Sequence, residues 1–367
     1  LRDFFTHRNG IPFWPLIRPK FRTLFSNDIP LTVAHLTAAE EIIESVQPDL
    51  LLAGLCEAST DAAYALAAGA AGVPSLGLQH GTILKGHADS VAFATDEFAV
   101  WGRSARRTLA RDSDVIVGNA DFEERYATSP ARTSVASVEI DPARPVCLYL
   151  GAVGWAVNDV DRYAEENLFA TVFDLRKAMP DVQLIMRLHA GEATELLREM
   201  ARERGVDAII DPNASLQELL ELSDVVVSQT TTAGLEAMIA GKPVIYLNIH
   251  CERDWLPYAE CGAAVGVYEA DQLAPAVKRV LSDATLREEL ARKARPLIAE
   301  QVDGLTGDSA RRMADLCERT IGERRGETGR TAYLNRMTAF MYNADSNWKP
   351  PGVVPLTTEV PLSAPTR

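Results

Sequence analysis

The stretch SDVVVSQTTTAGLEAMIAGKPVIYLN, residues 223–248, predicts a strand, a polar turn, a helix and a second strand in quick succession. The run from Asp224 to Ser228 is short, rich in β-branched residues and apolar on both faces, which is typical of a strand buried in a parallel sheet. Gly241 ends the helix, and the apolar run from Val244 to Leu247 follows it. The stretch therefore predicts an α/β fold built on parallel strands.

The polar turn of this stretch predicts an anion-binding site. Thr230, Thr231 and Thr232 place hydroxyl groups where the helix begins, beside unpaired backbone N–H groups and the positive end of the helix dipole. Gly234 would let a phosphate approach the backbone, and Glu236 could accept two hydrogen bonds from vicinal ribose hydroxyls. The alternative is a helix capped by threonines that binds no ligand.

Composition limits the class of protein. The chain has 367 residues, of which 47% are hydrophobic and 24% charged, and this fits two globular domains. A formal net charge of −14 argues against broad binding of nucleic acid, because clustered Lys and Arg grip a phosphate backbone. Five cysteines without a CxxC pair argue against a zinc site and a disulfide framework and favour a reducing cytosol, so we expect no metal.

Short apolar runs alternate with helical stretches along most of the chain. In the first half we expect strands at residues 49–55, 74–79, 97–101 and 114–117. In the second half we expect them at residues 146–150, 182–188, 208–210, 224–228, 244–247 and 264–268. Strands that alternate with helices predict parallel sheets with right-handed crossovers, and hence two Rossmann-like domains.

The turn-forming sequence DPARP at residues 141–145 marks the expected domain boundary. We expect an N-terminal domain of residues 1–143, a second domain of residues 144–325, and a proline-rich, partly disordered extension of residues 326–367. Two β/α domains in tandem would place a ligand cleft between the carboxyl ends of their sheets.

Residues 1–30 mix aromatic, proline and basic residues without a clean period. Such a mixture could contact a membrane surface or a partner, but an irregular segment packed on a domain is the favoured interpretation. No apolar run approaches the roughly 20 residues that span a bilayer, and no signal peptide is visible.

Two residues of the first half are candidates for acid–base chemistry. His80, in the sequence LQHGT, stands on a glycine turn just past a predicted strand, where α/β proteins bind ligands. It could act as a base or donate to a phosphate oxygen, or it could be a structural histidine. Glu57 follows the neighbouring strand and could take a proton from an acceptor hydroxyl, although an acid at a helix start explains it equally well.

Arg187 and His189 close the predicted strand VQLIMRL and alternate with its buried residues. Both could therefore point toward the ligand. A guanidinium at this position can hold a diphosphate through two parallel hydrogen bonds.

With these residues identified, the chain resembles the nucleotide-sugar glycosyltransferases of the two-Rossmann GT-B architecture, particularly those that build bacterial surface polysaccharides. Residues 223–247 are similar to their donor-binding strand, turn and helix, and LQHGT followed by WG and VGNADF resembles their N-terminal half. The resemblance spans roughly residues 45–300. Its C-terminal part is shared by the UDP-N-acetylglucosamine 2-epimerases and the CDP-glycerol glycerophosphotransferases.

The resemblance implies roles for several residues. Thr231 and Thr232 would lie at the donor diphosphate, Glu236 at the ribose, and Arg187 or His189 at phosphate. Such enzymes hold the donor without a bound metal, so no cofactor is expected beyond the nucleoside diphosphate sugar. One departure concerns the N-terminal domain, because only some 45 residues precede the first predicted strand and no glycine-rich first loop is visible. Either its first strands are missing from this chain or its sheet is shortened.

The leading functional hypothesis is transfer of a sugar from a nucleoside diphosphate to a hydroxyl of a glycan or lipid-linked acceptor, with His80 or Glu57 as the base. We expect such an enzyme in the cytoplasm, with a peripheral contact to the inner face of the membrane. The alternatives are a 2-epimerase that acts on a UDP-amino sugar and a module that binds nucleotide sugars without catalysis.

Overall fold

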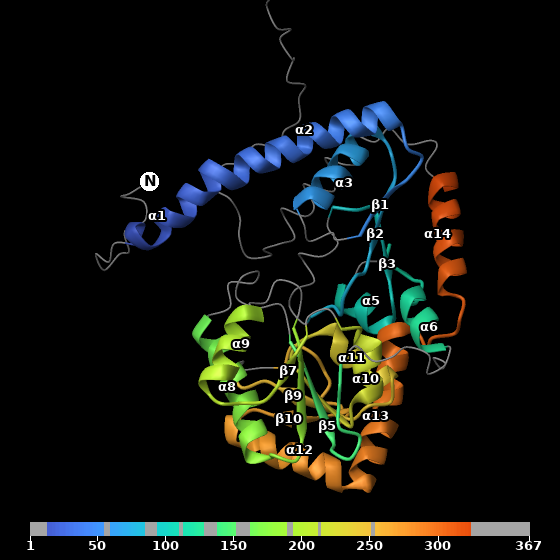
Figure 1. Ribbon diagram of the computed structural model, residues 1–367. Helices are drawn as coiled ribbons and strands as arrows, with labels where there is room; N and C mark the ends of the chain where they lie inside the picture. The colour runs from blue at the N-terminus through green and yellow to red at the C-terminus, as the bar shows by residue number, and fades with distance from the viewer. Residues whose placement is uncertain are drawn as a thin grey trace, which may run out of the picture.

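The structure, a computed structural model, describes residues 13–54, 59–84, 94–109, 113–127, 138–151, 162–188, 194–211, 214–250 and 254–323. These residues form two parallel sheets, each with helices packed against it (Figure 1). The predicted α/β class with two Rossmann-like domains is confirmed.

The first sheet has the strand order β1-β2-β3-β4, and all its neighbouring strands are parallel. Each of its strands falls inside a range expected from the sequence: β1 (Leu51–Ala53), β2 (Ser75–Leu78), β3 (Glu97–Val100) and β4 (Val115–Ile116). The helices that accompany this sheet are α3 (Ser59–Ala71), α5 (Arg103–Leu109) and α6 (Ala120–Ala127).

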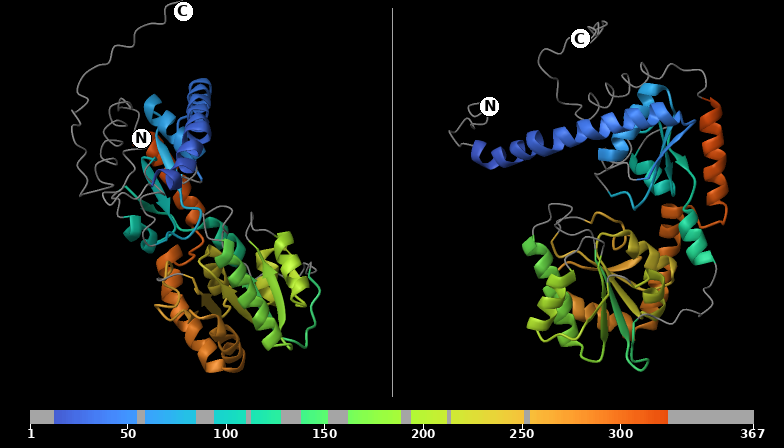
Figure 2. Two further views of the ribbon diagram at one scale, coloured as in Figure 1. Left: turned by 90° about the vertical axis from the view of Figure 1, so that its left-hand side faces the viewer. Right: turned by 45° about the horizontal axis from the view of Figure 1, so that its top comes forward.

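A long helical run precedes the first sheet. It consists of α1 (Trp14–Thr23), a π-helical turn (Leu24–Asp28) and α2 (Ile29–Val46). For residues 14–30, the expectation of an irregular segment packed on a domain is wrong, because these residues are helical and none of residues 14–28 is buried. Two of its prolines stand in the first turns of α1 and α2, where a missing N–H is tolerated, so they do not break the run. Figures 1 and 2 show this run extending beyond the rest of the first domain.

The second sheet has the order β10-β9-β8-β5-β6-β7 and is parallel throughout. Its strands are β5 (Val146–Leu150), β6 (Gln183–Arg187), β7 (Ile209–Ile210), β8 (Val225–Ser228), β9 (Val244–Leu247) and β10 (Ala264–Val267). Its helices are α8 (Arg162–Ala178), α9 (Thr194–Glu203), α10 (Leu216–Leu222), α11 (Thr232–Ile239), α12 (Leu273–Ser282), which a short 3-10 turn (Ala270–Gln272) precedes, and α13 (Ala284–Val302).

Strand β8 lies between β5 and β9 and is buried on both faces. Val226 packs into one hydrophobic core, whereas Val225 and Val227 pack into the other. This division follows from the alternation of side chains along a strand and explains the continuous apolar run in the sequence.

Helix α14 (Ser309–Glu323) belongs to the second domain by the predicted boundaries but packs on the first sheet (Figure 1). Leu316 packs with Leu76 and Ala99, and Arg319 donates to Glu97 of β3 at 2.7 Å. Helix α14 thus contacts the first sheet although it lies within the expected second domain of residues 144–325. The sequence shows an amphipathic helix at this point but contains no signal for which sheet covers it.

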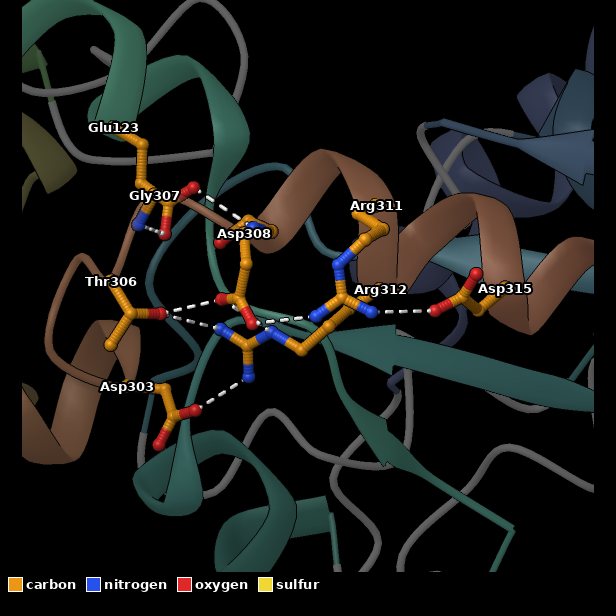
Figure 3. Close-up of polar contacts among 9 residues, drawn as sticks. Glu123, Asp303, Thr306, Gly307, Asp308, Arg311, Arg312 and Asp315 are labelled. Carbon is orange, nitrogen blue, oxygen red and sulfur yellow. Dashed lines mark hydrogen bonds and ion pairs between the residues drawn. The ribbon is translucent and has the colours of Figure 1, made fainter.

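A compact polar cluster joins α6 to the start of α14 (Figure 3). The carboxylate of Glu123 accepts hydrogen bonds from the backbone N–H groups of Gly307 and Ser309, each at 2.9 Å. Burial alone would raise the pKa of Glu123, but these hydrogen bonds and the charge of Arg312 outweigh it, and the pKa lies below its usual value. The chain turns sharply here, with positive φ at Asp303, Gly304, Leu305 and Gly307.

No described helix is both long enough and apolar enough to cross a membrane.

Candidate functional site

The start of α11 is built as the sequence predicts, with Thr231 as its N-cap. Thr231 has an extended backbone (φ −144°, ψ 150°), and its Oγ1 accepts a hydrogen bond from the N–H of Ala233 at 3.4 Å. This is the usual geometry of a threonine cap. The helix-cap interpretation therefore accounts for Thr231, and any ligand would meet the helix start with this cap already in place.

Buried tyrosines on the flanking strands fix the polar turn before α11. The hydroxyl of Thr230 lies 2.9 Å from the hydroxyl of Tyr246 on β9, and the side-chain amide of Gln229 donates to the hydroxyl of Tyr149 on β5. Tyr149 and Tyr246 are fully buried. The sheet thus holds the turn rigidly, and Thr230 has a protein partner in the position where the sequence predicted a ligand.

Gly234 is required by packing within the second domain. A Cβ at this position would lie 2.6 Å from Oγ of Ser228 and 3.1 Å from a ring carbon of Tyr258. Any larger residue would have to push these buried groups apart. The close approach that the sequence predicted at Gly234 is thus to side chains of the protein itself.

A contact between the domains joins the start of α11 to the LQHGT turn. The backbone N–H of Thr82 donates to Oγ1 of Thr232 at 3.0 Å, and the two hydroxyl groups lie 3.1 Å apart. Gln79 fixes the same turn from its other end, since its amide donates to the carbonyl of Gly81 and accepts from the N–H of Trp101, both at 2.8 Å.

His80 lies within this fixed turn, and its side chain is exposed. It has no hydrogen bond to any described residue. The role of His80 as a base stays a prediction. The second predicted base, Glu57, lies outside the described residues, as does His189.

Glu236 is buried in the first turns of α11 and is held by the first domain. Its Oε2 accepts hydrogen bonds from Nη1 of Arg125 at 2.6 Å and from the hydroxyl of Tyr126 at 2.9 Å. Both donors lie on α6. Burial and the nearby Glu236 carboxylate raise the pKa of the Tyr126 hydroxyl, so this hydroxyl remains a donor at neutral pH.

Arg187 is the last residue of β6. It is half-buried, and its Nε donates to the carbonyl of Ala214 at 3.3 Å. Its charge acts on Tyr126 and partly offsets the rise in that group's pKa. Arg187 and Glu236, which the sequence predicted to share one site, therefore both act on the Tyr126 hydroxyl, Glu236 through a hydrogen bond and Arg187 through its charge.

The sequence analysis missed the residues of the first domain that meet the predicted donor site. These are Thr82 on the LQHGT turn and Arg125 and Tyr126 on α6. Two residues separate the motif VGNADF from Arg125, but the motif contains no sign of which residue of the second domain Arg125 and Tyr126 contact. No group of three or more metal-binding side chains occurs among the described residues.

Comparisons with known proteins agree with this architecture. Residues 167–296, about a third of the chain, match the model of the family described as Glycosyl transferases group 1. No match is found among curated protein sequences.

Many solved structures share the fold. The S. aureus MnaA–UDP complex is 18% identical with a TM-score of 0.60, covering 80% of this chain and 81% of that chain. The UDP-GlcNAc 2-epimerase from Neisseria meningitidis bound to UDP-GlcNAc is 15% identical with a TM-score of 0.57, covering 78% and 81%. A glycosyltransferase from Rickettsia africae is 12% identical with a TM-score of 0.50, covering 81% and 83%.

These findings confirm the GT-B fold, and the family match supports a transferase. The match runs from within α8 to within α13, and this range includes the predicted donor-binding stretch at residues 223–248. The epimerases are relatives in fold, because identities below 20% carry no further information about activity.

Proposed function

We propose that this protein transfers a sugar from a nucleoside diphosphate donor to an acceptor hydroxyl. The observation that carries the proposal is the contact between Thr82 and Thr232, which brings the LQHGT turn of the first domain against the start of α11 in the second. A candidate base on one domain and the candidate donor groups on the other then meet at one site, as group transfer requires.

In this proposal the second domain binds the donor. The diphosphate lies at the start of α11, where backbone N–H groups, the helix dipole and Arg187 stabilise the negative charge that develops on the leaving group. The ribose lies at Glu236, and His189 adds a second group at phosphate. Because these groups supply the positive charge, the proposed reaction uses no metal.

The first domain supplies the base in this proposal. The acceptor oxygen attacks the anomeric carbon, the bond between that carbon and the phosphate oxygen breaks, and the nucleoside diphosphate leaves. The acceptor proton passes to the imidazole of His80, since histidine is the side chain that most often acts as a general base. Glu57 is the alternative base.

We further propose that the acceptor is a glycan or lipid-linked molecule of the cell surface and that the protein works in the cytoplasm at the inner face of the membrane. The outer part of the N-terminal helical run supports this placement. Leu16 and Phe25 are 71% and 61% exposed, and Arg18 and Arg22 on the same run are exposed beside them. Exposed apolar and basic residues on one helix suit an anionic lipid surface.

The experiment is incubation with UDP-, CDP-, GDP- and CMP-linked sugars, with and without a polyprenyl-phosphate-linked sugar as acceptor. Release of the nucleoside diphosphate that requires the acceptor, together with a glycosylated product, is the expected result. Interconversion of sugars without the acceptor would identify an epimerase, and binding without turnover would identify a non-catalytic module. Either of these results would overturn the proposal.

A further inference from the structure

The ion pair between Arg125 and Glu236 joins the two domains at the proposed ribose position. The Glu236 side chain is 9% exposed, whereas that of Arg125 is 33% exposed. A buried carboxylate is costly without a positive partner. Arg125 therefore supplies, from a helix of the first domain, the positive partner of Glu236 in the second.

Both donors of α6 bind the same carboxylate oxygen. Nη1 of Arg125 and the hydroxyl of Tyr126 donate to Oε2, and Oε1 has no hydrogen-bond partner among the described residues. A carboxylate can accept about four hydrogen bonds, so this arrangement fixes the orientation of Glu236 and leaves Oε1 available.

The α6 side of the contact is itself held in place. Nη2 of Arg125 donates to Asp121 one turn earlier, and its guanidinium lies 5.4 Å from the ring centroid of Phe122. The side-chain amide of Gln217, at the start of α10, donates to the backbone carbonyl of Arg125 at 2.8 Å. Arg125 is therefore preorganised by groups of both domains.

We propose that Arg125 and Tyr126 are positioning residues for the donor ribose, and that they hold Oε2 of Glu236 so that Oε1 receives the ribose hydroxyls. This inference rests on the proposed function, which places the ribose at Glu236. A ribose diol is neutral and cannot replace the charge of Arg125, so the ion pair persists when the nucleotide binds. The donor site is then complete only when the first domain contributes α6.

A second ion pair between the domains provides a matched control. Arg107 on α5 donates to Glu300 on α13 at 2.5 Å, and their side chains are 65% and 37% exposed. This contact also ties the first domain to the second, but it does not involve Glu236. Arg107→Ala tests what the loss of one interdomain ion pair does by itself.

The test compares the binding of UDP and 2′,3′-dideoxy-UDP by calorimetry, with CDP and GDP and their dideoxy forms measured in parallel. The wild-type protein should prefer the ribonucleotide about 10-fold or more, the usual effect of losing hydrogen bonds to a charged group. Arg125→Ala should weaken ribonucleotide binding about 10-fold and leave dideoxynucleotide binding nearly unchanged, so that the preference disappears. Arg125→Lys should restore part of the preference, Tyr126→Phe should reduce it about 3-fold, and Arg107→Ala should preserve it.

The failures of the two proposals are distinguishable. An Arg125→Ala protein that loses affinity for both nucleotides equally would show a merely structural role, and one that binds the ribonucleotide more tightly would show that Arg125 competes with the ribose. If Glu236→Ala abolishes the preference while Arg125→Ala and Tyr126→Phe keep it, this inference is wrong and the ribose site stands. A wild-type protein that binds no nucleoside diphosphate would instead contradict the proposed function.

Discussion

The two sides of the candidate site differ in how firmly their key side chains are held. On the second domain, Thr230, Thr231, Thr232 and Glu236 each have a hydrogen-bond partner. On the first domain, the backbone of the LQHGT turn is fixed, yet the side chain of His80 is exposed and has no partner among the described residues.

This difference matches the two roles that the proposed reaction requires, which are binding of the donor and removal of a proton from the acceptor. Groups that stabilise a diphosphate are most effective when their positions are set before the ligand arrives. A base needs an accessible nitrogen that can reach the proton of an incoming acceptor. The hydrogen-bonded residues of the second domain are therefore suited to binding the donor. The exposed His80, on a turn with a fixed backbone, is suited to taking a proton from the acceptor.

Replacing His80 should give the largest effect on turnover. His80→Ala should lower kcat by about 100-fold or more, the range for the loss of a general base, while donor affinity stays unchanged. Steady-state kinetics and calorimetry measure the two quantities separately. His35→Ala, a change on α2, serves as the control and should alter neither. Equal losses in kcat and donor affinity would make His80 a binding residue and remove the contrast between the two sides.

Removing the contact between Thr82 and Thr232, which joins the two sides, should lower activity less than replacing His80 does. Thr232→Val keeps the shape of the side chain but removes the hydroxyl that contacts Thr82, so we expect a loss of about 1 kcal/mol in transition-state stabilisation. The ratio of kcat/KM between wild-type and variant proteins measures it. Thr82→Val leaves its backbone N–H in place and should cost less. If the double variant loses the sum of the two single losses, the hydroxyls do not act as a pair.

Much of the fold follows from the sequence because its strands are buried in parallel sheets. Strand β8 packs into a hydrophobic core on each face, so its three consecutive residues Val225–Val227 are all apolar. This apolar run can be recognised in the sequence alone. The N-terminal helix was missed for the opposite reason: residues 14–28 are not buried, so no apolar period marks them. The sheet on which α14 packs was also missed, since that choice depends on the turn at residues 303–307.

The sequence predicted the LQHGT turn and the second-domain groups of the candidate site, but not the first-domain residues that contact them. The threonine cap and the position of Glu236 follow from local helix chemistry, so a single segment was enough to propose them. The partners of Glu236 come from α6, 111 and 110 residues away in the chain, and local patterns contain no information about such pairings. The tyrosines that fix the turn before α11 were missed for the same reason.

The polar cluster that joins α6 to the start of α14 should lose a small part of its contribution to stability in acid. The pKa of Glu123 lies below its usual value in the folded protein, so its contribution to stability is present at neutral pH and is lost as the pH falls through the folded pKa. Glu123→Gln should therefore lower the free energy of unfolding by about 1 kcal/mol at pH 7, and the difference should shrink below pH ~4. Thermal unfolding between pH 3 and 7 measures it.

If the difference in unfolding free energy between the wild-type and Glu123→Gln proteins stays constant across this pH range, the ionised carboxylate of Glu123 does not stabilise the polar cluster between α6 and α14. Glu289→Gln provides the control. Its exposed ion pair with Lys293 lies on one helix and should have little effect on unfolding at any pH.

The most direct test of the donor site is the binding of UDP, CDP and GDP by the wild-type protein and Glu236→Ala, measured by calorimetry. If Glu236 holds the ribose, the variant should lose about 1–3 kcal/mol of binding free energy for the nucleotide that the wild-type protein binds best. Its far-ultraviolet spectrum should remain that of the wild-type protein. Unchanged affinity in a folded Glu236→Ala protein would contradict the assignment of the donor ribose to Glu236.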